Sequence, residues 1–205
     1  MVLCEVREGE SSPVFQVSNI FPEMTEIEME YCSEEKSSHF FDIANIFPDI
    51  TEVEIDYCNG LERLPTAVCD IPNLKKLSIT NCHDLIELPE ARMGKLEVLR
   101  LRACTAMGSL PKSISELKKL KFLNLSECSN LSSLPETMGG LQGLETIDVR
   151  GCSARLPVTV KHLKGLIHVI CDEETQKMWK PFLVHFKRLV LLDVHKADVS
   201  LDFLQ

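Results

Sequence analysis

Residues 74–89 read LKKLSITNCHDLIELP, and the pattern returns in residues 96–111 (LEVLRLRACTAMGSLP) and 120–135 (LKFLNLSECSNLSSLP). A fourth copy with a shortened ending runs from Leu144 to Pro157. Each copy places aliphatic residues, one cysteine and, at its end, a Leu-Pro pair at matching positions. Six cysteines follow one another at intervals of 26, 24, 22, 24 and 24 residues: Cys32, Cys58, Cys82, Cys104, Cys128 and Cys152. A period this regular indicates one structural unit repeated along the chain.

The pattern LxxLxLxx(N/C)xxLxxLP is typical of leucine-rich repeats. Alternation points Leu77 and Ile79 inward and predicts a short strand, and such strands stack in parallel on a concave face. Each Leu-Pro pair ends an extended stretch, and residues 111–117 are expected to return along the convex side as a short helical turn that begins at proline. The predicted fold is therefore an α/β leucine-rich-repeat solenoid, stabilised by stacking of neighbouring coils.

Two further units precede these copies, since residues 15–32 match residues 41–58 at ten of eighteen positions. A polar insert, residues 33–38, lies between them and is expected to form a loop. We expect residues 1–14 to be the remnant of a preceding repeat, residues 15–170 to be the repeats, and residues 171–205 to form a C-terminal cap.

Within the predicted cap, Asp172 is expected to cap a short helix that carries Met178 and Trp179, and Pro181 should end or kink that helix. Residues 188–194 follow as a predicted final strand. Trp179 is expected to cover the last apolar coil, with a secondary contact to a partner as the alternative.

The six regularly spaced cysteines have two interpretations. In the structural one, each is a buried thiol that satisfies backbone groups of adjacent coils, as asparagine does in many leucine-rich repeats. In the other, neighbouring cysteines form a redox sensor, so that oxidation would abolish binding. The absence of CxxC spacing argues against a zinc site, and no metal or cofactor is expected.

Composition and charge exclude several function classes. The net charge of −9 disfavours binding to nucleic acid and to anionic membranes. The sequence has no apolar run of 18 residues and no signal-peptide pattern at its start, so we expect an intracellular chain. It also lacks GxSxG, HExxH and GxxxxGK[ST], and none of its six histidines pairs with a nucleophile at a recognisable spacing, so we expect no enzymatic activity.

The outward strand positions form the candidate site. Charge along this face is expected to run from acidic in the first two units, through basic, to mixed. Such segregation of sign is typical of a surface that orients a protein partner. The candidate partner-binding residues are Lys75, Lys76, Ser78, Arg100, Arg102, Lys121, Phe122, Asn124, Asp148 and Arg150. Arg100, Arg102 and Phe122 are the predicted anchors, because arginine and aromatic residues are enriched in binding hot spots.

Three stretches carry a family resemblance: DYCNGLERLP (residues 56–65), CDIPNLKKLSITNCHDLIELPE (69–90) and CDEETQKMW (171–179). They resemble the C-terminal repeats of plant helper immune receptors of the nucleotide-binding leucine-rich-repeat class with a powdery-mildew-resistance type of coiled coil. The duplicated units and the insert at residues 33–38 depart from that family.

The resemblance implies a recognition module of plant innate immunity and the hypersensitive response. Its implied partner is a lipase-like heterodimer of the enhanced-disease-susceptibility class that itself carries the small-molecule ligand, and its location would be the cytoplasm or nucleus. The sequence contains neither the coiled coil nor the P-loop, so the chain is expected to be an excised domain or a truncated paralogue that competes with full-length helpers. The alternative is an autoinhibitory solenoid that clamps its own nucleotide-binding domain.

Overall fold

The computed structural model describes residues 25–30, 49–90 and 92–193. The predicted remnant strand, the insert at residues 33–38 and Cys32 lie outside the described residues. So does most of the first duplicated unit, together with the end of the predicted cap.

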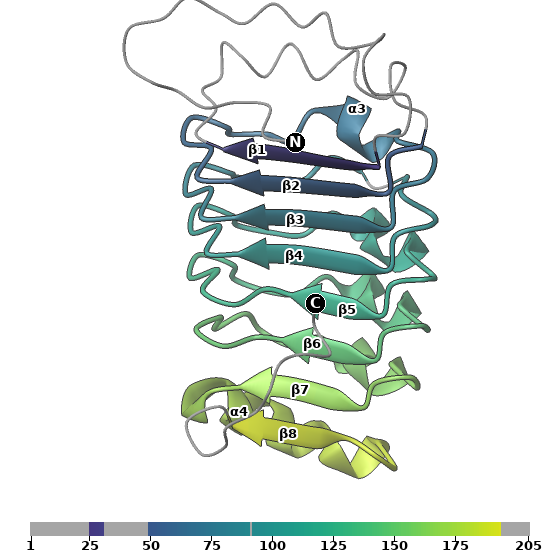
Figure 1. The fold of residues 1–205 in the computed structure, drawn as a ribbon. Helices are drawn as coiled ribbons and strands as arrows, with labels where there is room; N and C mark the ends of the chain where they lie inside the picture. Colours follow the sequence, from purple (N-terminus) through teal and green to yellow (C-terminus); the bar gives the residue numbers. More distant parts are fainter. Residues whose placement is uncertain (1–24, 31–48, 91, 194–205) are drawn as a thin grey trace, which may run out of the picture.

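Every strand of the described chain belongs to one parallel sheet, in which sequence order and spatial order are the same (Figure 1). The strands are β1 (Glu26–Glu30), β2 (Glu52–Asp56), β3 (Lys76–Thr80), β4 (Val98–Arg102), β5 (Phe122–Asn124), β6 (Thr146–Asp148), β7 (His168–Cys171) and β8 (Val190–Asp193). Each coil of the chain adds one strand beside the previous one, so the predicted solenoid is confirmed.

Alternation within each strand builds the core, as the sequence predicts. In β3, Leu77 and Ile79 point inward and are 0% exposed, and they lie opposite Leu99 and Leu101 of β4. Leu123 continues the first of these rows on β5. Stacked aliphatic rows of this kind bury apolar surface only because a neighbouring coil covers them.

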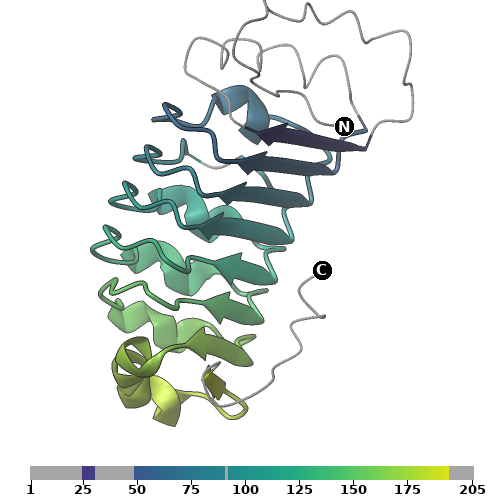
Figure 2. The same ribbon diagram turned by 60° about the vertical axis from the view of Figure 1, so that its left-hand side comes forward.

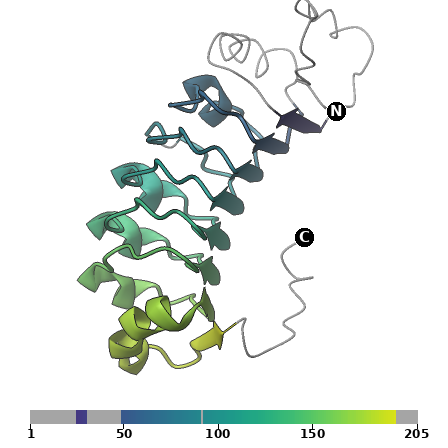
Figure 3. The same cartoon turned by 90° about the vertical axis from the view of Figure 1, so that its left-hand side faces the viewer.

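Short helices return the chain on the side opposite the sheet, which leaves the strands on the concave face (Figures 2 and 3). They are α3 (Thr66–Cys69), η2 (Lys112–Glu116), η3 (Glu136–Gly140), η4 (Val158–His162), α4 (Glu173–Trp179) and η5 (Lys180–His185). η2, η3 and η4 are 3-10 turns, and each directly follows the proline of a Leu-Pro pair. Pro111 has φ −64° and ψ 149°, an extended conformation that ends the preceding segment as predicted.

A left-handed residue turns the chain immediately before each described cysteine of the ladder. The backbone angle φ is positive at Tyr57, Asn81, Ala103, Glu127 and Gly151. Four of these five residues carry a Cβ, and the left-handed conformation is sterically unfavourable for residues with a Cβ. The repeat pattern contains no glycine signal here, so sequence analysis missed this turn.

The cysteine ladder behaves as the structural interpretation predicts. The thiols of Cys82, Cys104 and Cys128 donate to main-chain carbonyls of the preceding coil, those of Ile55, Ile79 and Leu101 respectively. Among the described residues, the cysteines of the ladder from Cys58 to Cys152 are buried, and they keep their thiol groups. Cys82, Cys104 and Cys128 thus bind adjacent coils together at one repeated position.

The C-terminal helix begins and ends where the sequence predicts. Asp172 accepts a hydrogen bond from the Thr175 amide at 2.9 Å, and the Thr175 hydroxyl accepts from the Asp172 amide at 3.0 Å, which completes a capping box. α4 ends at Trp179, and the chain continues as η5 with Pro181 in its first turn. β8 then pairs with β7 in parallel, so the sheet continues into the region expected to be a cap.

Candidate functional site

Parallel register sets the outward-pointing residues of the eight strands in rows that run across the concave face. The middle row contains Glu28, Glu54, Ser78, Arg100, Asn124, Asp148, Ile170 and Leu192. The row beside it contains Glu26, Glu52, Lys76, Val98, Phe122, Thr146, His168 and Val190. The remaining predicted residues border these rows: Lys75, Arg102, Lys121 and Arg150. The structure therefore brings the predicted concave-face residues together on one surface.

The first two coils form an acidic end of this surface. Glu26 lies opposite Glu52, and Glu28 lies opposite Glu54, so carboxylates face carboxylates across β1 and β2. Lys76 of β3 reaches back into this group, and its Nζ lies 3.0 Å from Glu52 and 2.7 Å from Glu54. Burial lowers the pKa of Lys76, but hydrogen bonds to Glu54 and Glu52 outweigh that effect and raise it.

Three other predicted cations also have carboxylate partners. Arg102 lies 3.4 Å from Glu127, and Lys121 lies 2.8 Å from Glu97, both in exposed pairs. Arg150 donates from Nε and Nη2 to the two carboxylate oxygens of Asp148. The basic stretch predicted from sequence is thus largely neutralised by partners on its own or adjacent coils.

Arg100 differs from these cations. Its guanidinium lies over the Phe122 ring, 5.5 Å from the centroid, a distance typical of a cation–π contact. Within the residues that the structure describes, no carboxylate lies within ion-pair distance of it. Burial lowers the pKa of Arg100, and the nearby charges of Glu54 and Glu52 act in the opposite direction.

Several predicted contact residues hold the backbone and are little exposed. Asn124 accepts a hydrogen bond from the Ser126 amide at 2.7 Å, and Asp148 accepts one from the Arg150 amide at 3.2 Å. Asp148 is 0% exposed, and Ser78, Phe122 and Asn124 are also buried. The Ser126 hydroxyl is buried too and has no hydrogen-bond partner among the described residues. Asn124 and Asp148 therefore hold the backbone beneath the concave face and offer little side-chain surface for contact with a partner.

Trp179 belongs to the core. Its side chain is 1% exposed and packs with the buried aliphatic residues, in keeping with the expectation that it covers an apolar coil. The alternative expectation of a secondary contact to a partner requires accessible surface, which this side chain does not offer here.

The buried thiols are poorly suited to redox chemistry. Burial raises the pKa of Cys104 and of Cys128 to about 12, and a hydrogen bond with Cys58, followed by burial, raises that of Cys82. The thiolate is the reactive form of cysteine, so these groups remain protonated and unreactive near neutral pH.

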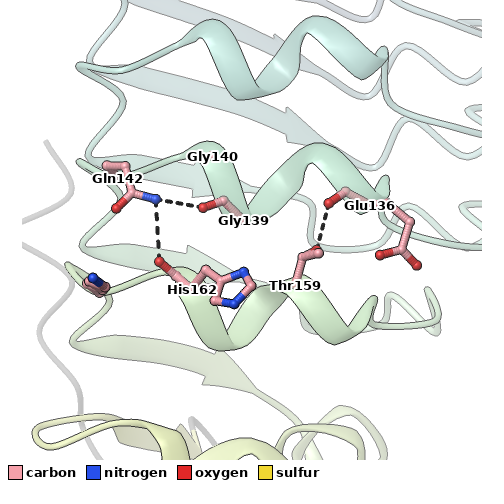
Figure 4. Close-up of a pocket in the computed structure, with 7 residues that line it drawn as sticks. Glu136, Gly139, Gly140, Gln142, Thr159 and His162 are labelled. Atoms are coloured by element: carbon pink, nitrogen blue, oxygen red, sulfur yellow. Dashed lines mark hydrogen bonds between the residues drawn. The ribbon is translucent and has the colours of Figure 1, made fainter.

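A hollow of about 440 Å³ lies on the convex side between η3 and η4, and sequence analysis did not predict it (Figure 4). Gln142 spans its edge by donating to the carbonyls of Gly139 and His162. A Cβ on Gly139 would lie only 2.5 Å from the Thr159 carbonyl oxygen, so the close approach of the two coils requires glycine there. The hollow follows from this packing and contains no recognisable catalytic arrangement.

Two further properties concern residues 25–30, 49–90 and 92–193, the part of the chain that the structure describes. None of the helices there has the length and apolar character needed to cross a bilayer. In the same segments, no group of three or more histidine, cysteine or acidic side chains is arranged to hold a metal ion.

No curated protein matches the sequence at a significant level. The leucine-rich repeat domain of the type III effector XopL is a similar solved structure, with 22% identity, coverage of 75% of this chain and 70% of that chain, and a TM-score of 0.38. An internalin from Listeria monocytogenes is 12% identical over 82% of this chain and 71% of that chain, with a TM-score of 0.25. The family model described as leucine-rich repeat region matches residues 91–205, more than half of the sequence, and the chain therefore belongs to the leucine-rich-repeat family.

Proposed function

We propose that this chain is a recognition module of plant innate immunity that binds a lipase-like heterodimer of the enhanced-disease-susceptibility class through its concave face. The partner would carry the small-molecule ligand, and the chain would act in the cytoplasm or nucleus without catalytic activity. A leucine-rich-repeat region is typically a protein-binding module, and that coarser assignment underlies the proposal.

The observation that carries the proposal is the continuous concave face. Its charged side chains are segregated along the solenoid, with acidic residues on β1 and β2 and arginines on β4. An arrangement of this kind favours one orientation of a partner over others. The partner class comes from the sequence resemblance to helper immune receptors.

The test is a calorimetric titration of the full chain against assembled lipase-like heterodimers, with and without their nucleotide-derived ligand. A double variant, Arg100→Glu with Arg102→Glu, reverses two charges on the concave face. We expect ligand-dependent binding that weakens at least about tenfold in this variant, as for hot-spot residues. The matched control is Arg63→Glu with Arg155→Glu, which makes the same charge change at two exposed arginines outside the eight strands.

Each outcome of the titration has a distinct meaning. Absence of binding to every heterodimer would overturn the proposed partner. Equal weakening by the control pair would show that net charge, and not the concave face, governs the interaction. Binding in trans to a helper nucleotide-binding domain instead would favour the autoinhibitory alternative. If the proposal holds, the isolated repeats should also compete with a full-length helper for the heterodimer.

A further inference from the structure

We propose that Arg100 is the docking point for a single carboxylate of a partner protein, an aspartate or glutamate side chain with an apolar residue beside it. The inference rests on the proposed protein-binding function but not on the identity of the partner. It assigns a chemical role to one position of the concave face.

Strand register gives Arg100 no counter-ion within the part of the chain that the structure describes. Its direct neighbours in the middle row are Ser78 on β3 and Asn124 on β5. Neither residue carries a charge, and the side-chain oxygen Oδ1 of Asn124 already accepts a hydrogen bond from the Ser126 amide.

The next carboxylates along the same row are already held by other cations. Glu54, two strands away on one side, lies 2.7 Å from the Nζ of Lys76. Asp148, two strands away on the other side, receives hydrogen bonds from both Nε and Nη2 of Arg150. Moving either carboxylate to Arg100 would break an existing ion pair, so the described residues do not supply this arginine with a carboxylate partner.

Phe122 gives Arg100 a defined place. The guanidinium lies 5.5 Å from the ring centroid, and Val98, partly exposed, lies opposite Phe122 in the neighbouring row. A guanidinium held against a ring keeps its N–H groups available at its edge, where a carboxylate binds in a bidentate manner. An apolar side chain next to that carboxylate would contact the partly exposed Val98.

The surrounding charges restrict the partner further. Arg100 is half-buried and has lost part of its hydration without gaining an ion pair among the described residues, so a partner carboxylate would find it partly desolvated. The carboxylates of Glu54 and Glu52 lie close enough to act on the pKa of Arg100, which they raise against the effect of burial. They would repel a run of acidic residues, and for this reason the proposal specifies one carboxylate.

The experiment uses a phage-displayed library of random linear peptides, selected on the full chain and counter-selected on the Arg100→Gln variant. Enriched peptides are synthesised and their affinity is measured by fluorescence polarisation. We expect them to contain one acidic residue adjacent to an apolar residue, and to bind Arg100→Gln at least about tenfold more weakly. The peptide affinity of the Arg100→Lys variant should lie between those of the wild-type chain and Arg100→Gln, because lysine keeps the charge but loses the bidentate fork.

The control is Arg63→Gln, the same substitution at an exposed, ion-paired arginine outside the strands. It should leave peptide affinity unchanged, and matching circular dichroism melts would show that all variants are folded. Peptides without an acidic residue, peptides that bind Arg100→Gln equally well, or failure to select any peptide would overturn the inference. This assay contains no lipase-like protein, so its failure is separate from failure of the proposed function.

Discussion

The central coils and the last described coil belong to the same parallel sheet but differ in burial. On β4, Leu99 and Leu101 are 0% exposed and have a coil on each side. On β8, Leu191 is only partly buried, and Val190 is 46% exposed. Among the described strands, β8 has a neighbour on one side only. In a solenoid, the contribution of a leucine therefore depends on its neighbouring coils more than on its own repeat.

Ion pairs in the central and the C-terminal regions also differ in burial. In the coil of β6, the Asp148 carboxylate is fully enclosed and Arg150 is its charged partner. In α4, Lys177 pairs with Glu173 and Glu174, whose side chains are more than 80% exposed. Exposed pairs contribute little to stability, whereas a buried charge depends on its partner.

The largest effect is expected from Leu99→Ala. Removal of a fully buried side chain should lower the free energy of unfolding by about 3 kcal/mol. The matched change Leu191→Ala, in the last coil, should cost about 1 kcal/mol, because less apolar surface is lost from the core. Urea denaturation followed by circular dichroism measures both. Hydrogen exchange should locate the Leu191→Ala effect in β7 and β8. An equal loss of unfolding free energy in the two variants would contradict the difference between central and last coils.

A smaller effect is expected from Arg150→Ala. It leaves the Asp148 carboxylate buried without its charged partner, which should cost about 2 kcal/mol, below the range for a fully buried pair because Arg150 is itself 32% exposed. Arg102→Ala breaks an exposed pair and should cost less than about 1 kcal/mol. Thermal melts of both variants would sharpen the contrast between enclosed and exposed pairs. A larger loss from Arg102→Ala would contradict it.

Asp172→Ala tests the junction between the two regions, because Asp172 caps α4 and also accepts from the Gly151 amide of the preceding coil. The loss of this cap should cost about 1.5 kcal/mol near neutral pH. Burial raises the pKa of Asp172, but hydrogen bonds from the Thr175 and Gly151 amides outweigh that effect. The pKa of Asp172 therefore lies below its ordinary value of 3.8.

The direction of that shift predicts a pH dependence for the same variant. A lowered pKa in the folded state stabilises the protein above the unfolded-state value, and the contribution is lost as pH falls through the folded-state value. The difference between wild type and Asp172→Ala should therefore be full at pH 6 and shrink below about pH 4. Urea titrations at several pH values measure it, and a difference that grows on acidification would exclude this role.

A still smaller effect than that of Asp172→Ala is expected from Gly151→Ala, where the left-handed turn of the β6 coil carries glycine at φ 64°. Adding a Cβ there should cost about 1 kcal/mol. Gly108→Ala is the matched control, because a Cβ at that position would have no neighbour within 4 Å. Equal melting temperatures for the two variants would mean that the left-handed turn costs little in this solenoid.

The inward rows could be predicted from the sequence because alternation and period are local properties. Leu77, Ile79 and the buried ladder cysteines all lie where the pattern places them. The capping residue Asp172 was predictable for the same reason, since a helix cap involves residues three positions apart. The left-handed residues before the cysteines were not, because the usual glycine signal is missing at four of those five positions.

The candidate surface was predictable as a list of residues but not as a set of interactions. Register across strands decides that Lys76 reaches Glu52 and Glu54 and that Asp148 is enclosed with Arg150. These partners come from other coils or from a bend of the chain, and a linear pattern does not reveal which charges remain unpaired.

The sequence by itself determined the repeat, the inward aliphatic rows and therefore the solenoid, because short-range periodicity dictates which residues must be buried. Only the tertiary structure decided which charged residues neutralise one another, how deeply Trp179 is buried, and that Arg100 lies against Phe122 without a carboxylate among the described residues. The physical reason is distance: burial, and ion pairs such as Lys76–Glu52 and Lys121–Glu97, depend on atoms in adjacent coils that are more than 20 residues apart in the chain.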